Sequence, residues 1–329
     1  MRRDTIRRSL YWTVSILVSA ALLYGALRGV AWSRVWDIIA HADLRYIGAG
    51  TAITCWSYFV RSARWRILLN AEGRLGAGTV FWANMAGYLG NSFLPARAGE
   101  VVRTMLICGQ SALSKTYVLT TALSERMMDA VALVLWSAIA LWGVNPKPAW
   151  MREVSGGMTA VAAAGTLLVV VLPHIRGWLE ALLERIPMPG AIRGRLLGLT
   201  GQVLRGLRAF HDWKRLAGFV LLTVVIWVSD AVGTMIGARA LGLHVTFPAA
   251  MLLLAGMGLG SALPSTPGYV GVYQFAAVTI LTPFGISRDG ALAYSLVAQA
   301  TGYVLVLAGG LPGLYLLRRK PPAGAREAP

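Results

Sequence analysis

Six charged residues lie close together in a chain that is otherwise strongly apolar: Arg97, Glu100, Arg103, Glu125, Arg126 and Asp129. An ionised side chain near the centre of a bilayer costs roughly 2.5–3.5 kcal/mol, so six unpaired charges would be hard to accommodate there. On a helix, Glu100 can meet Arg103 three residues later, and Arg126 can meet Asp129. The spacing therefore predicts partial internal pairing. Charges retained inside a membrane commonly mark a substrate or ion site.

A break in the chain accompanies this charged cluster. Pro95 cannot donate a backbone amide and Gly99 tolerates an open backbone geometry, and these two residues bracket Arg97. The pattern predicts a bent hairpin that lines a polar cavity, with Asn91 on its first arm. Freed helix ends present amides to anions, and Arg97, Arg103 or Arg126 would add positive charge. A phosphate head group is the ligand that fits this chemistry.

Composition sets the environment of these residues. The 329-residue chain is 56% hydrophobic and 14% charged, with a mean hydropathy of +0.60, which is too apolar for a soluble domain. The net charge of +17 comes from basic residues placed between apolar segments, which favours anionic lipid head groups as partners over nucleic acid. The scattered histidines, two isolated cysteines and absence of a phosphate-binding loop motif predict no metal, no other cofactor and no ATP hydrolysis.

The hydropathy pattern predicts an all-α polytopic membrane protein. Apolar segments are expected to cross the membrane at residues 10–27, 44–60, 116–142, 157–172, 216–238 and 291–317, with an interfacial helix at 31–40. Two broken, re-entrant hairpins are expected, one at 79–109 and the other formed by 247–263 and 269–284. Arginines at both ends of the membrane part place the N- and C-termini in the cytoplasm of a bacterial inner membrane. Residues 61–66, which are rich in arginine, are interpreted as a membrane boundary, with Arg61 and Arg64 as anchors.

Four regions follow from this pattern. Residues 1–173 form an N-terminal half, 174–215 a connector, 216–320 a C-terminal half, and 321–329 a disordered tail. The connector carries eight Lys or Arg and three acidic residues, and its apolar stripes predict amphipathic helices on the cytoplasmic surface. A solvated linker with incidental apolar residues is the alternative.

The two halves share a motif at a spacing of 169 residues. Six residues of the first hairpin align with identical residues in the second half: Gly87, Ser92, Leu94, Pro95, Gly99 and Val101 with Gly256, Ser261, Leu263, Pro264, Gly268 and Val270. The charge bias gives the paired segments opposite directions, which is typical of an inverted-topology repeat. Two broken hairpins at corresponding places would then enclose the binding site, so Pro264 and Gly268 join the candidate residues.

Four motifs in sequence order resemble the membrane domain of the lysylphosphatidylglycerol synthase/flippase family. They are Arg61-Ser-Ala-Arg-Trp65, the segment 91–103, Glu125-Arg-Met-Met-Asp129 and the segment 264–271, and the resemblance extends over about residues 10–317. It implies a translocator that moves a lipid head group from the inner to the outer leaflet. The synthases of this family carry a soluble domain after the membrane part, and this chain ends soon after its last basic cluster, so no synthase activity is expected. Gln274 stands where the family pattern implies Glu, which weakens any acid role at the second hairpin.

Several alternatives remain open at this stage. Arg97, Glu100 and Arg103 could form a purely structural salt-bridge set, and the 125–129 segment could latch the hairpin or couple to protons. Asp230 could pair with a cation of the opposite half. The leading hypothesis is a non-enzymatic flippase for an anionic phospholipid or lipid-linked substrate. The rivals are a glycosyl or acyl transferase that acts on a lipid carrier, with Glu100, Glu125 or Asp129 as base, and a scaffold for a lipid-modifying enzyme.

Overall fold

The computed structural model describes residues 2–94, 98–142, 212–261, 263 and 265–319, and these contain α-helices and short 3-10 turns but no strand. The predicted all-α fold is thus confirmed for this part of the chain. The predicted span at 157–172, nearly all of the connector, the tail, and the candidates Arg97 and Pro264 lie outside the described residues. The ten described α-helices are α1 Arg2–Leu27, α2 Trp32–Ala40, α3 Leu44–Leu69, α4 Ala77–Phe93, α5 Gly99–Cys108, α6 Lys115–Trp142, α10 Trp213–Arg239, α11 Phe247–Gly260, α12 Val272–Leu281 and α13 Arg288–Arg319.

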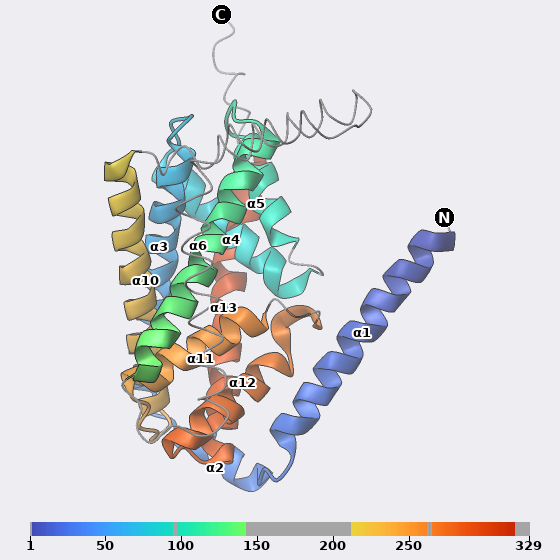
Figure 1. The fold of residues 1–329 in the computed structure, drawn as a ribbon, viewed down its shortest axis with the longest axis vertical. Coiled ribbons are helices and arrows are strands. Elements are labelled where there is room, and N and C mark those ends of the chain that lie inside the picture. The colour runs from blue at the N-terminus through green and yellow to red at the C-terminus, as the bar shows by residue number, and fades with distance from the viewer. Residues whose placement is uncertain (1, 95–97, 143–211, 262, 264, 320–329) are drawn as a thin grey trace, which may run out of the picture.

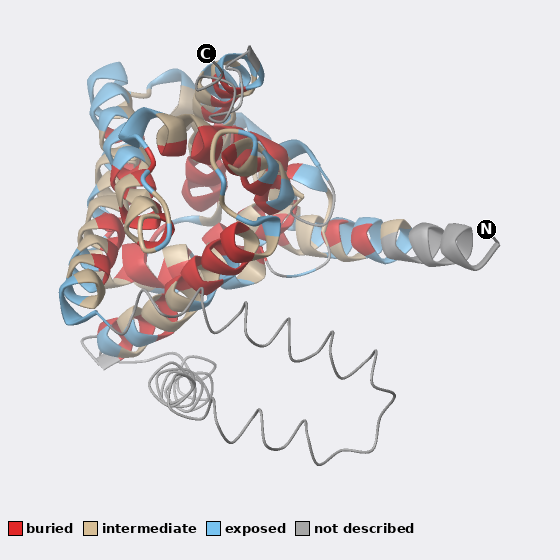
Figure 2. Cartoon of the chain, turned by 90° about the horizontal axis from the view of Figure 1, so that it is seen from above, coloured by how far each residue is buried: buried red, intermediate tan, exposed pale blue. Residues whose placement is uncertain are grey.

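Two helices are long and apolar enough to cross a membrane, α10 and, over residues 288–318, α13. A third candidate span is the pair formed by Trp12–Leu27 and Trp32–Ala40, which is bent by 83°. Helices α3 and α6 are as long, at 26 and 28 residues, but both carry several charged residues. Many large apolar side chains point outward, including Ile16, Leu221 and Val304, as expected of helices that face lipid. Figure 2 shows the buried residues gathered where the helices meet.

Helix α3 lies beside α10 and runs in the opposite direction (Figure 1). The two backbones approach closely at small residues: a methyl group on Gly50 would lie 3.6 Å from the amide nitrogen of Gly237. Near the other end of the pair, Gly218 lies against Ile67. Small residues permit this close packing between membrane helices. Helix α3 continues to Leu69, so the basic segment 61–66 lies inside the helix.

The predicted break near Pro95 is confirmed by the helix ends on either side of it. Helix α4 ends at Phe93, and α5 begins at Gly99 and packs back against α4. Gly99 has no room for a side chain, because a Cβ atom there would overlap the carbonyl oxygen of Gly87 and lie 2.6 Å from the amide nitrogen of Asn91. The glycine thus permits the tight contact between the two arms.

The corresponding segment of the second half is built from α11, the turn η3 Pro267–Tyr269 and α12. Gly268 and Gly271 adopt φ angles of +79° and +87°, a left-handed geometry that favours glycine. At ten residues, α12 is about 15 Å long, which is too short to cross a bilayer. The break expected in the second hairpin thus lies between α11 and α12. Helix α1 contacts this turn through a hydrogen bond between Ser19 Oγ and the amide of Thr266, 2.9 Å long.

Replacing Gly99 with alanine is expected to destabilise the fold by about 1–3 kcal/mol, because the added methyl group must push α5 away from α4. Thermal unfolding of the detergent-purified protein measures this effect. Gly78→Ala, on α4, is the matched control, because a methyl group there meets no atom within 4 Å and alanine favours helix. Equal unfolding temperatures for both variants would contradict the packing described here.

Candidate functional site

Four arginines and four carboxylates from α3, α5, α6 and α10 form one network among the described residues. Its members are Arg61, Arg64, Arg103 and Arg126 with Glu100, Glu125, Asp129 and Asp230. The positive and negative charges balance. Five of these residues were candidates from the sequence, and the suggested pairing of Asp230 with a cation of the other half is confirmed. Arg61 and Arg64, interpreted from the sequence as boundary anchors, pair with carboxylates of α6 and α10; Arg64 is buried, and Arg61 keeps 12% of its side chain exposed.

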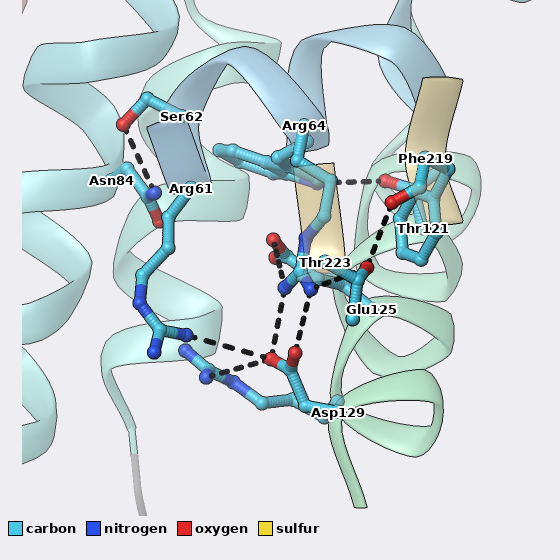
Figure 3. A network of polar contacts seen from close by, with 12 residues as sticks. Arg61, Ser62, Arg64, Asn84, Thr121, Glu125, Asp129, Phe219 and Thr223 are labelled. Atoms are coloured by element: carbon cyan, nitrogen blue, oxygen red, sulfur yellow. Dashed lines mark hydrogen bonds and ion pairs between the residues drawn. The ribbon is translucent and has the colours of Figure 1, made fainter. Parts of the chain in front are cut away.

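Arg64 lies at the centre of the network and has no solvent-exposed surface. Its Nη1 atom donates to Asp129 Oδ1 over 2.6 Å and to Thr223 Oγ1 over 3.0 Å, and Nη2 donates to Asp129 Oδ2 over 2.9 Å and to Glu125 Oε1 over 3.0 Å. The guanidinium carbon also lies 4.9 Å from the centre of the Phe219 ring. This one side chain on α3 joins α6 and α10 (Figure 3).

Arg103 attaches α5 to the same network. Its Nη1 atom donates to Glu125 Oε2 and to Asn84 Oδ1, each over 2.9 Å, and its Nη2 atom pairs with Glu100. The guanidinium lies over the ring of Trp65, 4.3 Å from its centre. Glu125 therefore bridges two arginines, with one carboxylate oxygen on each.

Arg61 and Arg126 lie at the edge of the network. Arg61 Nη2 is 2.5 Å from Asp230 Oδ2, and the side chain lies over Trp227 with 5.0 Å to the ring centre. Arg126 Nε is 2.9 Å from Glu100 Oε1, and its side chain remains 29% exposed. The most buried charges thus form the centre of the network, and these two arginines lie at its edge.

A cavity of about 440 Å³ lies beside this edge of the network, where Arg61 and Arg126 line it. It lies between both halves of the chain, and residues of α3, α4, α6, α10, α11, α12, α13 and η3 line it. Of the described candidates, Asn91 and Arg126 line the cavity. Glu100, Arg103, Glu125 and Asp129 are not lining residues and support Arg61 and Arg126 from behind. The size falls within the range of ordinary small-molecule sites, about 300–1,000 Å³.

The sequence reasoning missed most of the cavity wall. The wall includes five tyrosines from separate elements: Tyr58, Tyr88, Tyr269, Tyr273 and Tyr294. It also carries hydroxyl groups of serines and threonines on α3, α10 and α13. Aromatic and hydroxyl residues attract little notice in a membrane sequence, because each is individually compatible with a span.

Gly268 and Gln274 form a separate neutral network behind the second turn and are not among the lining residues. Gln274 Oε1 accepts a hydrogen bond from the amide of Gly271 over 2.7 Å, and its Nε2 donates to Gln299 Oε1 over 2.6 Å. Tyr303 Oη donates to the carbonyl of Gly268 over 2.8 Å. Gln274 thus caps the start of α12 and holds the turn.

The charged network offers no metal site within the described residues, where no group of three or more His, Cys, Asp or Glu side chains is placed to hold an ion. Its carboxylates are engaged by arginines instead. The arrangement can present guanidinium groups to a polar ligand in the cavity, and it keeps the positions of those groups fixed.

Arg64→Met is expected to cost about 3–5 kcal/mol of stability, because Glu125 and Asp129 would lose a buried cationic partner. Adding Asp129→Asn should recover part of the loss by removing one orphaned charge. The matched control is Arg45→Met, on the exposed surface of the same helix, with an expected change within about 0.5 kcal/mol. Unfolding in detergent measures all three, and wild-type stability of Arg64→Met would contradict a central role for this arginine.

Comparison with known proteins gives the family. Residues 12–310 match the family model described as the lysylphosphatidylglycerol synthase TM region. The chain is 21% identical to a UPF0104 membrane protein of Methanothermobacter thermautotrophicus, covering 93% of this chain and 92% of the relative, and 21% identical to the UPF0104 membrane protein PH1989 of Pyrococcus horikoshii, covering 93% and 96%. This chain is also 25% identical to a Haloferax volcanii protein named Glycosyltransferase AglD, over 96% of this chain.

The match to AglD spans only 55% of the length of that protein. No solved structure matches the chain. The two UPF0104 relatives are archaeal membrane proteins, and the family match covers residues 12–310, which include the charged network and the cavity. The chain is therefore an integral, multi-pass membrane protein, and it belongs to the family of the lysylphosphatidylglycerol synthase transmembrane region.

Proposed function

We propose that this protein moves an anionic phospholipid or a lipid-linked substrate between the two leaflets of the membrane. The observation that carries the proposal is the cavity of about 440 Å³ between the two halves, with Arg61 and Arg126 on its wall. A head group with a phosphate would enter this cavity, while its acyl or prenyl chains stay in the bilayer. Charge-assisted hydrogen bonds from guanidinium groups suit a phosphate.

An inverted repeat explains why the cavity lies between the halves. A shift of 169 residues lays α3 on α10, α4 on α11, part of α5 on α12 and most of α6 on α13. The paired helices α3 and α10 run in opposite directions, as do α6 and α13 (Figure 1). Four pairs of cavity residues are related by the same shift: Tyr58 and Trp227, Arg61 and Asp230, Tyr88 and Met257, and Ser92 and Ser261. We infer that the two short-helix hairpins are re-entrant and that the halves rock about the site between them.

The buried network supplies what a transport site of this kind needs. Eight charged groups pair with one another away from lipid, so the arginines are held in place before a ligand arrives. Arg126 contacts Glu100 and Asp129 and keeps 29% of its side chain exposed. A phosphate can therefore approach Arg126 without first breaking the central pairs of Arg64.

A transferase is the second candidate, and the name of the relative AglD is the observation that favours it. Among the described lining residues, however, Asp230 is the one carboxylate, and it already pairs with Arg61. A general base needs a free carboxylate within reach of the acceptor, so the geometry supports transport without catalysis. Incubation with a nucleotide sugar and a polyprenyl phosphate separates the two, because a glycolipid product would establish the transferase. A scaffold for a lipid-modifying enzyme would show neither activity.

The proposal includes a bacterial inner-membrane location with both termini in the cytoplasm, based on the arginines near each end. Alkaline phosphatase, which folds only outside the cytoplasm, tests this when fused after Leu317. An inactive fusion supports the orientation, and an active one contradicts it. A fusion of green fluorescent protein at the same position is the control, because it is expected to fluoresce only when inside the cell.

Filling the cavity should stop transport without unfolding the protein. Gly302 lines the cavity, and a Cβ atom there would meet no atom within 4 Å, so Gly302→Trp can place a large ring in the open space. We expect at least a tenfold loss of leaflet exchange of fluorescent phosphatidylglycerol in liposomes. Gly48→Trp is the control, because Gly48 is equally open but lies on the exposed surface of α3. Unchanged exchange in Gly302→Trp would refute the cavity as the path.

A further inference from the structure

We propose that the cavity recognises a head group in which a phosphate is joined to a sugar or another polyol ring. The inference rests on the proposed function in treating this cavity as the substrate site, and it specifies the class of ligand. It starts from three properties of the wall: its aromatic rings, its unpaired polar atoms and its distribution of charge.

The aromatic rings form two pairs, one from each half of the chain. Tyr58 and Tyr88 lie with ring centres 5.1 Å apart, and Tyr269 and Tyr273 stack with 5.2 Å between centres and an angle of 18° between planes. All four line the cavity. Flat aromatic surfaces with polar groups at their edges suit a ligand that has C–H faces and peripheral hydroxyl groups. A pyranose or cyclitol ring has this form, and a linear aminoalkyl group does not.

Three buried polar atoms of cavity-lining residues have no hydrogen-bond partner: Ser57 Oγ, Trp227 Nε1 and Asn91 Oδ1, of which the last can only accept. Ser57 and Trp227 are 1% and 6% exposed, and buried polar atoms in proteins are nearly always paired. An indole N–H can only donate, whereas a serine hydroxyl both donates and accepts. Ligand hydroxyls match both requirements, while phosphate oxygens match donors alone.

The charge of the wall selects the rest of the head group. The charged lining residues among those described are Arg61, Arg126 and Asp230, and Asp230 is occupied by Arg61 at 2.5 Å. A phosphate would be attracted to Arg126, whereas an ammonium group would meet two guanidinium groups and no free carboxylate there. The wall therefore disfavours a cationic aminoacyl or aminoethyl head group and favours a phosphate that carries neutral hydroxyls.

The same chemistry can come from a soluble sugar phosphate or from a lipid head group, so the test has two arms. In the first, isothermal titration of the detergent-purified full chain compares glucose 1-phosphate with inorganic phosphate, glucose and phosphoethanolamine. We expect glucose 1-phosphate to bind at least tenfold more tightly than each of the others. Equal affinities for glucose 1-phosphate and inorganic phosphate, or for glucose 1-phosphate and phosphoethanolamine, would overturn the proposal.

Ser57→Ala and Trp227→Phe each remove an atom that has no partner within the protein, so neither should lower the unfolding temperature by more than a few degrees. Each should weaken glucose 1-phosphate binding about three- to tenfold. Ser137→Ala is the matched control, because Ser137 is buried, lies on α6 and does not line the cavity. Wild-type affinity in both cavity variants would show that these atoms are not used by a ligand and would overturn the assignment.

In the second arm, liposomes report leaflet exchange of labelled phosphatidylinositol and labelled phosphatidylethanolamine. Faster exchange of phosphatidylinositol, reduced by Ser57→Ala, supports a lipid-borne polyol phosphate. Exchange that ignores the head group, together with no preference in titration, would leave lipid transport standing and reject this inference. Selective binding of glucose 1-phosphate without any lipid exchange would uphold the ligand class and reject the proposed function.

Discussion

The pairing of Arg64 with Asp129 and Glu125 is the interaction on which the rest of this structure depends. Each of these charges would be prohibitively costly alone among apolar helices, and each becomes tolerable because the others satisfy it. The pairing fixes α3 against α6 and, through Thr223, against α10. Removing one partner leaves an uncompensated charge, so the helices that carry the network are constrained to meet at this place.

That constraint accounts for the position of the cavity. Glu125 connects Arg64 to Arg103 and so brings α5 to the network, while Asp129 and Asp230 bring Arg61 to its edge. The buried charges are therefore structural support, and the arginines at the edge contact the open space. Arg64 and Arg103 hold the helices together, whereas Arg61 and Arg126 line the cavity and are the cations that our proposal assigns to a ligand.

The two hairpins are held in place by different kinds of interaction. The first hairpin is fastened by charged residues, with Arg103 between Glu100 and Glu125. The second is fastened by neutral amides and a phenol, with Gln274 bound to Gln299. The side chain of Gln274 is neutral and needs no cationic partner, whereas the Glu that the family resemblance implies at this position would need one. Asymmetry of this kind gives the two sides of the cavity different chemistry: cations come from the first half, and the stacked tyrosine pair at the turn comes from the second.

The sequence by itself determined the class of the protein, the break near Pro95 and the existence of a charged cluster at Glu100, Arg103 and residues 125–129. Composition and local spacing carry this information, because helices repeat every 3.6 residues and charges in apolar segments are conspicuous. It did not determine the role of Arg61 and Arg64, which share the local pattern of membrane-boundary residues. Their partners lie 61 to 169 residues away on other helices, and only the tertiary packing brings them together. The aromatic cavity wall was likewise decided by tertiary structure, since tyrosines from separate elements form a surface only after the halves have packed against each other.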